Sequence, residues 1–102
     1  MNIRYTPSAQ ADLREIRVYI SDVLNNPTAA KNVTDKIIRS CHLLGGQPNM
    51  GASLQSKTGR ETDLRFLVCG NHIVFYKADD GSISVVRILD GRTDYMKYLF
   101  TD

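Results

Sequence analysis

The spacing of apolar residues changes once along this chain, and that change limits the folds the chain can adopt. Between residues 9 and 44, apolar residues recur every three or four positions, the period of helices that bury one face. From residue 63 to residue 89 they alternate or run together in short segments bounded by turn residues, which is typical of strands. An α+β fold of two layers, with helices covering one face of a sheet, satisfies both periods.

Two helices are predicted in the first half, each begun by a capping residue followed by proline. Thr6-Pro7 begins the first helix, which runs to about Asn25, and Asn26-Pro27 begins the second at once, because proline has no N–H to leave unpaired there. Gly45-Gly46 is expected to end the second helix in the left-handed conformation that glycine adopts without penalty. The very short connection predicts an antiparallel helical hairpin with one joint apolar face.

Residues at helical spacing define the faces of this hairpin. The first apolar stripe consists of Ala9, Leu13, Ile16, Ile20, Val23 and Leu24. The second consists of Ala29 or Ala30, Val33, Ile37, Ile38, Cys41 and Leu44. The charged residues assigned to the other side of the first helix are Asp12, Arg14, Arg17 and Asp22.

Strands are expected at residues 1–6, 63–69, 72–78 and 82–89. Tight turns at Gly70-Asn71 and at Asp80-Gly81 join the last three into an antiparallel meander. Residues 45–62 are predicted to form a long loop with a short strand near its end, and residues 94–100 to form a last helical turn or to dock on the core. The order is therefore β-α-α-β-β-β: one domain, 1–102, whose antiparallel sheet packs against the N-terminal helical hairpin.

Composition excludes several classes of protein. The chain has 102 residues, a net charge of +2 and 42% hydrophobic residues, so it is expected to form one packed core rather than a disordered segment. It contains neither the apolar run of about 20 residues that a membrane helix needs nor the pattern of a secretory leader, which predicts a cytoplasmic protein. Cys41 and Cys69 are expected to be buried thiols, and the spacing of His42 and His72 favours neither a zinc site nor another cofactor.

Cationic and aromatic residues interleave along the last three strands. The cationic group consists of Lys57, Arg60, Arg65, His72, Lys77, Arg87, Arg92 and Lys97, and the tyrosines among them are Tyr76, Tyr95 and Tyr98. One interpretation is a shallow basic surface that meets phosphate, on which His72 serves as a general base. The alternative is structural: Arg65 pairs with Asp63 or Asp90, Arg92 pairs with Asp94, and the tyrosines belong to the core or its rim. The apolar residues of the tail, from Tyr95 to Phe100, either close the core or await a partner chain.

Two stretches of the sequence resemble the RelE/ParE superfamily of toxins. Residues 5–13, YTPSAQADL, are similar to the superfamily's passage from its first strand into its first helix, x-P-x-A-x-x-D-L. Residues 64–76 and 86–94, the latter reading VRILDGRTD, are similar to its terminal strands and their R-V-L-H-G-R-x-D ending. The resemblance spans nearly the whole chain and agrees with the order of elements derived above.

The resemblance implies the toxin of a type II toxin–antitoxin system, which a cognate antitoxin neutralises and which meets operator DNA only through that antitoxin. The RelE-like branch cleaves mRNA at the ribosome, and the ParE-like branch inhibits DNA gyrase. In either branch Arg65, Arg87 and Arg92 are the predicted target-binding residues. For a nuclease, the catalytic candidates are His72, Arg87, Tyr95 and Tyr98, because cleavage needs a base, an acid and cationic stabilisation.

Three positions depart from the cleaving branch. Ile73 stands where that branch carries an arginine, Thr93 replaces a second basic residue, and Asp90 replaces a common histidine. The ending of the chain is closer to the ParE-like branch, so we expect a gyrase inhibitor. An mRNA endoribonuclease and a non-toxic relative that only binds an antitoxin are the alternatives.

Overall fold

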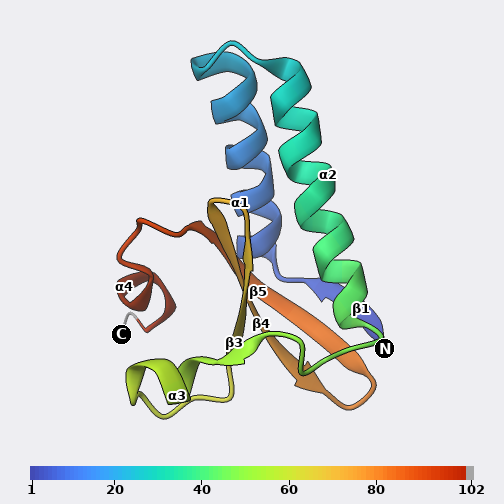
Figure 1. Ribbon diagram of the computed structural model, residues 1–102, viewed down its shortest axis with the longest axis vertical. Helices are drawn as coiled ribbons and strands as arrows, with labels where there is room; N and C mark the ends of the chain where they lie inside the picture. The colour runs from blue at the N-terminus through green and yellow to red at the C-terminus, as the bar shows by residue number, and fades with distance from the viewer. Residues whose placement is uncertain (101–102) are drawn as a thin grey trace.

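The computed structural model describes residues 1–100 and arranges them as a sheet with helices on both faces (Figure 1). The element order is β1 (Asn2–Tyr5), α1 (Pro7–Val18), a π-helical turn η1 (Tyr19–Val23), α2 (Pro27–Leu44), β2 (Ala52–Ser53), α3 (Leu54–Thr58), β3 (Arg65–Cys69), β4 (His72–Asp79), β5 (Ser82–Asp90) and α4 (Tyr95–Leu99). This α+β architecture confirms the predicted fold class.

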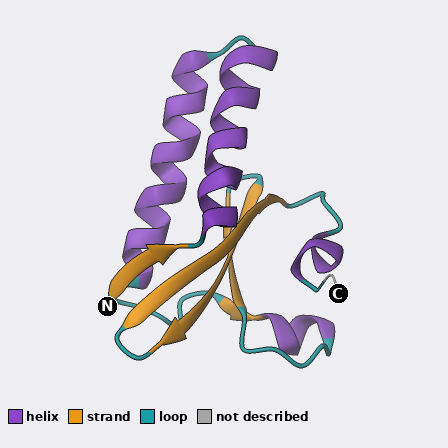
Figure 2. Ribbon diagram, turned by 180° about the vertical axis from the view of Figure 1, so that it is seen from behind, coloured by secondary structure: helices purple, strands orange, loops and turns teal. Residues whose placement is uncertain are grey.

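The five strands lie in the order β1-β5-β4-β3-β2. β3, β4 and β5 form the predicted antiparallel meander, whereas β1 pairs in parallel with β5, so the sheet as a whole is mixed. The helical hairpin of α1 and α2 stands on one face, and Figure 2 shows it rising from the sheet with α3 and α4 away from it. The predicted start of the first meander strand, residue 63, is two residues early.

Both helix starts form as the sequence predicted. The Thr6 side chain accepts a hydrogen bond from the Ala9 amide, and the Asn26 side chain accepts one from the Ala29 amide. Each cap satisfies an N–H that has no partner within its helix. Both helices of the hairpin therefore begin at the capping residues that the sequence predicted.

The end of the first helix differs from the prediction. The α-helical ladder stops at Val18 and becomes a π-turn, in which the Leu24 amide donates to the Tyr19 carbonyl oxygen at 3.1 Å. This turn shifts the helical spacing, so Val23 and Leu24 lie 66% and 54% exposed instead of within the apolar stripe.

Gly45 ends the second helix, but not in the left-handed conformation that was predicted, because its φ is −61°. A Cβ at this position would lie 2.9 Å from the carbonyl oxygen of Met1. Glycine is therefore needed here because the N-terminal strand passes close to the helix end.

The segment 45–62 contains more structure than predicted. The short strand β2 lies mid-segment, not near its end, and the helix α3 follows it at once. Ser53 caps α3 by accepting a hydrogen bond from the Ser56 amide, and Gly59 ends it with a φ of +77°.

Apolar residues fill both faces of the sheet. Between the sheet and the helical hairpin lie Ala9, Ile37, Cys41, Cys69, Val74, Val85 and Ile88. Beneath α3 and α4 lie Leu54, Leu64, Ile73, Phe75 and Leu89, on which Tyr95, Met96, Leu99 and Phe100 pack. The predicted burial of both cysteines is confirmed, and both are free thiols. The tail forms the predicted last helical turn and docks on the core.

Candidate functional site

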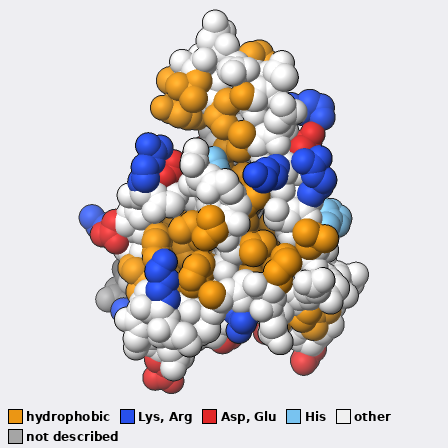
Figure 3. Space-filling view, viewed as in Figure 1, with side chains coloured by type: hydrophobic (Ala, Val, Ile, Leu, Met, Phe, Trp, Pro, Cys, Tyr) orange, Lys and Arg blue, Asp and Glu red, His pale blue; other side chains and the backbone are white. Residues whose placement is uncertain are grey.

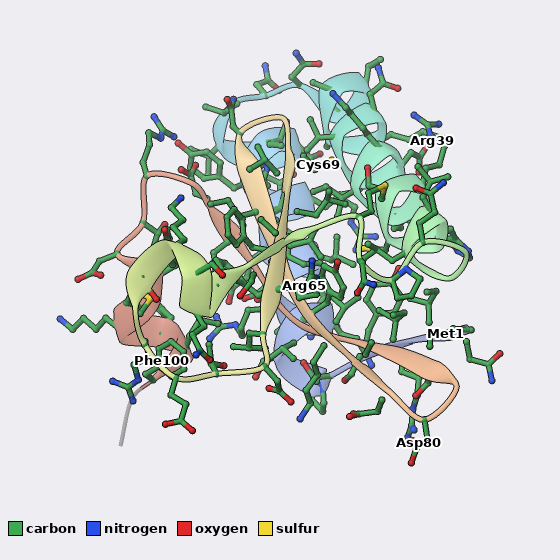
Figure 4. The ribbon with its side chains drawn as sticks, turned by 60° about the horizontal axis from the view of Figure 1, so that its bottom comes forward. Met1, Arg39, Arg65, Cys69, Asp80 and Phe100 are labelled. Atoms are coloured by element: carbon green, nitrogen blue, oxygen red, sulfur yellow. The ribbon has the colours of Figure 1, made fainter. Side chains whose placement is uncertain are left out.

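Arg65 holds the loop before β2 rather than presenting its charge to a ligand. Its Nε and Nη2 donate to the Gly51 carbonyl oxygen at 3.0 and 2.6 Å, and Nη2 also reaches the Asn49 oxygen at 3.3 Å. The predicted ion pairs of Arg65 with Asp63 or Asp90 do not form among the described residues. Figure 4 shows Arg65 near the centre of the molecule, away from the labelled Phe100.

Arg87 is engaged by Asp12 of α1. Nε and Nη2 of Arg87 donate to the two carboxylate oxygens at 2.8 and 2.9 Å, and the same carboxylate accepts the Ile88 amide at 2.9 Å. The hydrogen bonds with Asp12 are the main reason why the pKa of Arg87 is raised above its ordinary value. The Tyr98 ring lies 5.6 Å from the guanidinium carbon, so Arg87 joins α1, β5 and α4.

Assigning Asp12 to the polar side of the first helix is wrong, because Asp12 is 6% exposed. β1 pairs with β5 only as far as Tyr5↔Val85. Beyond that point, the Asp12 carboxylate accepts the hydrogen bond that the Ile88 amide donates from the edge of β5. The sequence did contain a signal for this position. Asp12 lies three residues after Ala9 and four before Ile16, within the apolar stripe itself.

Arg92 is the most exposed of the three predicted target-binding residues, with 89% of its side chain accessible. It pairs with Asp90 through two hydrogen bonds of 3.0 and 2.9 Å, not with Asp94 as predicted. The hydrogen bonds from Arg92 hold the pKa of Asp90 at about 2. An exposed pair of this kind contributes little to stability, which leaves Arg92 available to a partner.

His72 lies across the β4–β5 ladder from Asp90. Burial lowers its pKa, an effect opposed by Asp90 and assisted by Arg92. The imidazole is therefore expected to be neutral at neutral pH.

We expect an NMR titration of His72 to give a midpoint below the ordinary value of about 6.5. Because the unfolded chain then binds a proton at a higher pH than the folded chain, the stability contributed by this histidine is complete above about 6.5 and is lost as pH falls toward the folded pKa. Asp90→Asn removes the charge that raises the pKa, so it should lower the midpoint further. A midpoint above that of an unstructured histidine would contradict the assignment.

An apolar groove of about 450 Å³ lies between the helical hairpin and the β3–β4 turn. Its apolar wall consists of Ile16, Tyr19, Ile20, Leu24 and Val33, and its floor includes Cys69. The ionisable residues at its rim are Glu15, Lys36, His72, Asp90 and Arg92. Figure 3 shows apolar atoms exposed near the end of the helical hairpin, at the top of the molecule, and again over its centre. The groove therefore combines an apolar wall with a rim that includes the most exposed predicted site residue.

Two of the remaining cationic residues, Lys57 and Arg60, lie over aromatic rings on the opposite face. The Lys57 ammonium lies 4.9 Å from the Phe66 ring and 5.9 Å from the Tyr95 ring, and the Arg60 guanidinium lies 4.3 Å from the Phe100 ring. Such contacts stabilise a surface modestly while leaving the cation accessible. These contacts connect Lys57 and Arg60 to β3 and to the C-terminal segment, and of the predicted tyrosines only Tyr95 takes part in them.

Tyr76 belongs to the core, in agreement with the structural alternative. It is fully buried, and its hydroxyl donates to the Pro48 carbonyl oxygen at 2.8 Å while the hydroxyl oxygen accepts a hydrogen bond from the Gly51 amide at 2.9 Å. Together with Arg65 it fixes the conformation of the long loop.

The four nuclease candidates do not converge on one site. His72 lies at the rim of the groove on the hairpin side, whereas the Tyr95 ring packs against Phe75 on the other face, with centroids 5.1 Å apart. Arg87 is held by Asp12, and Tyr98 lies beside Arg87. A base and an acid must both lie within hydrogen-bond reach of the reacting atoms, and His72 and Tyr95 lie on opposite faces of the sheet.

Comparison with known proteins decides the family. A family model described as the ParE toxin of the type II toxin–antitoxin system parDE matches residues 3–95. The chain belongs to the ParE toxin family. The structure is also similar to one solved for a chromosomal ParDE toxin–antitoxin system from P. aeruginosa, with a TM-score of 0.74 and 24% sequence identity over 88% of this chain and 95% of that one. No curated protein sequence matches.

Membership of the ParE family makes this chain the toxin component of a type II toxin–antitoxin system and confirms the predicted resemblance. A cognate antitoxin is its partner. The sequence motifs that carried the resemblance have structural roles: the aspartate of the first motif and the first arginine of the last motif are Asp12 and Arg87, which pair.

Proposed function

We propose that this ParE-family toxin arrests growth by inhibiting DNA gyrase rather than by cleaving mRNA. The separation of His72 from Tyr95, on opposite faces of the sheet, carries the proposal, because these two candidates are not placed to serve one site as acid and base. The match to the ParE toxin model supports the same target. The toxin would act in the cytoplasm; within residues 1–100, no helix has the length and apolar character to cross a membrane.

Arg92 is the residue that we assign to target contact. Arg65 and Arg87 donate their hydrogen bonds to groups inside the molecule. They therefore act indirectly, by positioning the long loop and α1. The guanidinium of Arg92 stands at the rim of the groove and is 89% exposed. An exposed cation at the rim of an interface guides association with an oppositely charged partner.

A supercoiling assay tests this proposal directly. We expect the purified chain to prevent DNA gyrase from supercoiling a relaxed plasmid, and to leave mRNA intact in a translating extract. Arg92→Ala should weaken inhibition about tenfold, the equivalent of about 1.4 kcal/mol, with an unchanged thermal midpoint. Arg14→Ala is the matched control, because Arg14 is also exposed but lies on α1 outside the groove. Codon-bounded mRNA cuts with unimpaired gyrase would overturn the proposal in favour of the nuclease, and unimpaired growth on expression would favour the non-toxic relative.

A further inference from the structure

The floor of the groove contains a nucleophilic side chain that the proposed function does not use. Cys69 is the last residue of β3 and one of the residues that line the groove. It is 6% exposed and packs between the sheet and the helical hairpin (Figure 4). The groove therefore gives a small molecule access to this sulfur.

Cys69, His72 and Asp90 form a row across three neighbouring strands. The register pairs Cys69 directly with His72 in the β3–β4 ladder, and His72 directly with Asp90 in the β4–β5 ladder. Side chains of directly opposite residues lie on one face of a sheet, with Cβ atoms about 4.5–5.5 Å apart, and all three residues line the groove. A thiol beside an imidazole that a carboxylate supports is an arrangement that activates cysteine as a nucleophile.

Two groups of α2 favour the deprotonated, reactive form of Cys69. The Ser40 hydroxyl oxygen lies 3.4 Å from the Cys69 sulfur, so it can donate a hydrogen bond to the thiolate. Lys36 precedes Ser40 by one helical turn, lines the groove and forms no salt bridge within residues 1–100. A nearby ammonium stabilises a thiolate. Burial lowers the pKa of His72, so its imidazole is neutral at neutral pH and able to accept the thiol proton.

The second cysteine provides an internal comparison. Cys41 is fully buried on α2 and is not among the residues that line the groove. Burial raises the pKa of its thiol to about 11. Because the thiolate rather than the thiol attacks a disulfide, we expect Cys41 to be unreactive in the folded chain and unable to displace a group attached to Cys69.

We propose that Cys69 is a site of thiol–disulfide exchange, at which a low-molecular-weight disulfide enters the groove and becomes attached to the sulfur. The Cys69 thiol passes its proton to the His72 imidazole, and the thiolate attacks one sulfur of the disulfide. A new S–S bond forms, the original S–S bond breaks, and the departing thiolate takes the proton from His72, so the disulfide itself is the oxidant. The attached half remains in the groove and changes the surface that the groove presents to other molecules. This inference does not depend on the toxin's target.

Dipyridyl disulfide is a suitable probe, because it is small and uncharged and releases a strongly absorbing thione at each exchange. We expect the folded chain to release one equivalent, with the pyridyl adduct located on Cys69 by peptide mass spectrometry, and the chain in urea to release two, one for each cysteine. Cys69→Ser should abolish the release from the folded chain. His72→Gln should slow it about tenfold, because the proton acceptor is lost. His42→Gln is the matched control, since His42 is exposed on α2 outside the groove and its loss should leave the rate unchanged.

Peptide mapping of the unmodified chain keeps the proposal testable if a variant fails to fold. An adduct on Cys41, a disulfide between Cys41 and Cys69 in place of the adduct, or a folded chain that releases no thione until it unfolds would overturn the proposal. Equal rates for His72→Gln and the unmodified chain would overturn the role given to His72. A chain that carries the adduct on Cys69 but does not inhibit gyrase would contradict the proposed function alone.

Discussion

Asp12→Ala is expected to destabilise the fold by about 3 kcal/mol, because removing one partner of a largely buried ion pair leaves the other charge without compensation. The Arg87 side chain is 23% exposed, so its guanidinium would lose two hydrogen bonds and gain little water. The Ile88 amide would lose its acceptor as well. Urea denaturation followed by circular dichroism measures the difference.

The matched control is Asp35→Ala, which breaks the exposed pair of Lys31 and Asp35 within α2. An exposed pair at this helical spacing contributes only about 0.3–0.5 kcal/mol. A second test is the double variant Asp12→Ala with Arg87→Met, which should recover part of the loss because no uncompensated charge remains. Equal effects of Asp12→Ala and Asp35→Ala would refute the role assigned to Asp12.

Gly51→Ala is expected to destabilise the chain by about 3 kcal/mol, because the added methyl group has no space. A Cβ at Gly51 would lie 2.6 Å from the Phe66 carbonyl oxygen and 2.7 Å from the Tyr76 hydroxyl. The loop would have to move away from Tyr76, which breaks the hydrogen bond that the Gly51 amide donates to that hydroxyl. Leaving such buried groups unpaired adds to the cost of the clash.

Gly46→Ala provides the control for this effect. A Cβ at Gly46 would lie 3.9 Å from its nearest neighbour, the Leu43 carbonyl oxygen, so we expect a change of no more than about 0.5 kcal/mol. Thermal and urea unfolding of both variants measure the difference. Equal stability of the two alanine variants would show that the loop adapts freely and that Tyr76 and Arg65 do not fix it.

Local patterns predicted those parts of the fold that depend on neighbouring residues. Thr6-Pro7 and Asn26-Pro27 cap helices through contacts three residues away, and the turns after Cys69 and Asp79 follow from glycine, asparagine and aspartate at fixed positions. The pairing of β1 with β5 was not predicted, because parallel pairing of distant segments leaves no local signal in the sequence.

The candidate site was less predictable than the fold, for a physical reason. The sequence shows which residues carry charge, but not which charges are satisfied inside the molecule. Arg65 donates to backbone oxygens of a loop, and Arg87 pairs with a residue of the first helix, so neither partner lies nearby in the sequence. The groove depends on the π-turn, which shifts the helical spacing from Tyr19 onward. This turn contains no proline or glycine, so it has no local signal in the sequence.

The parallel pairing of β1 and β5 has a consequence for the order of folding. The Thr6 hydroxyl donates to the Val86 carbonyl oxygen, and β1 aligns residue for residue with Ser82–Val85, so β1 pairs with a strand that is synthesised long after it. The nascent helical hairpin therefore has no completed sheet to cover until β5 has left the ribosome. Contacts between residues so distant in sequence also slow folding. A chain that terminates before β5 lacks the partner strand of β1 and cannot assemble the complete sheet.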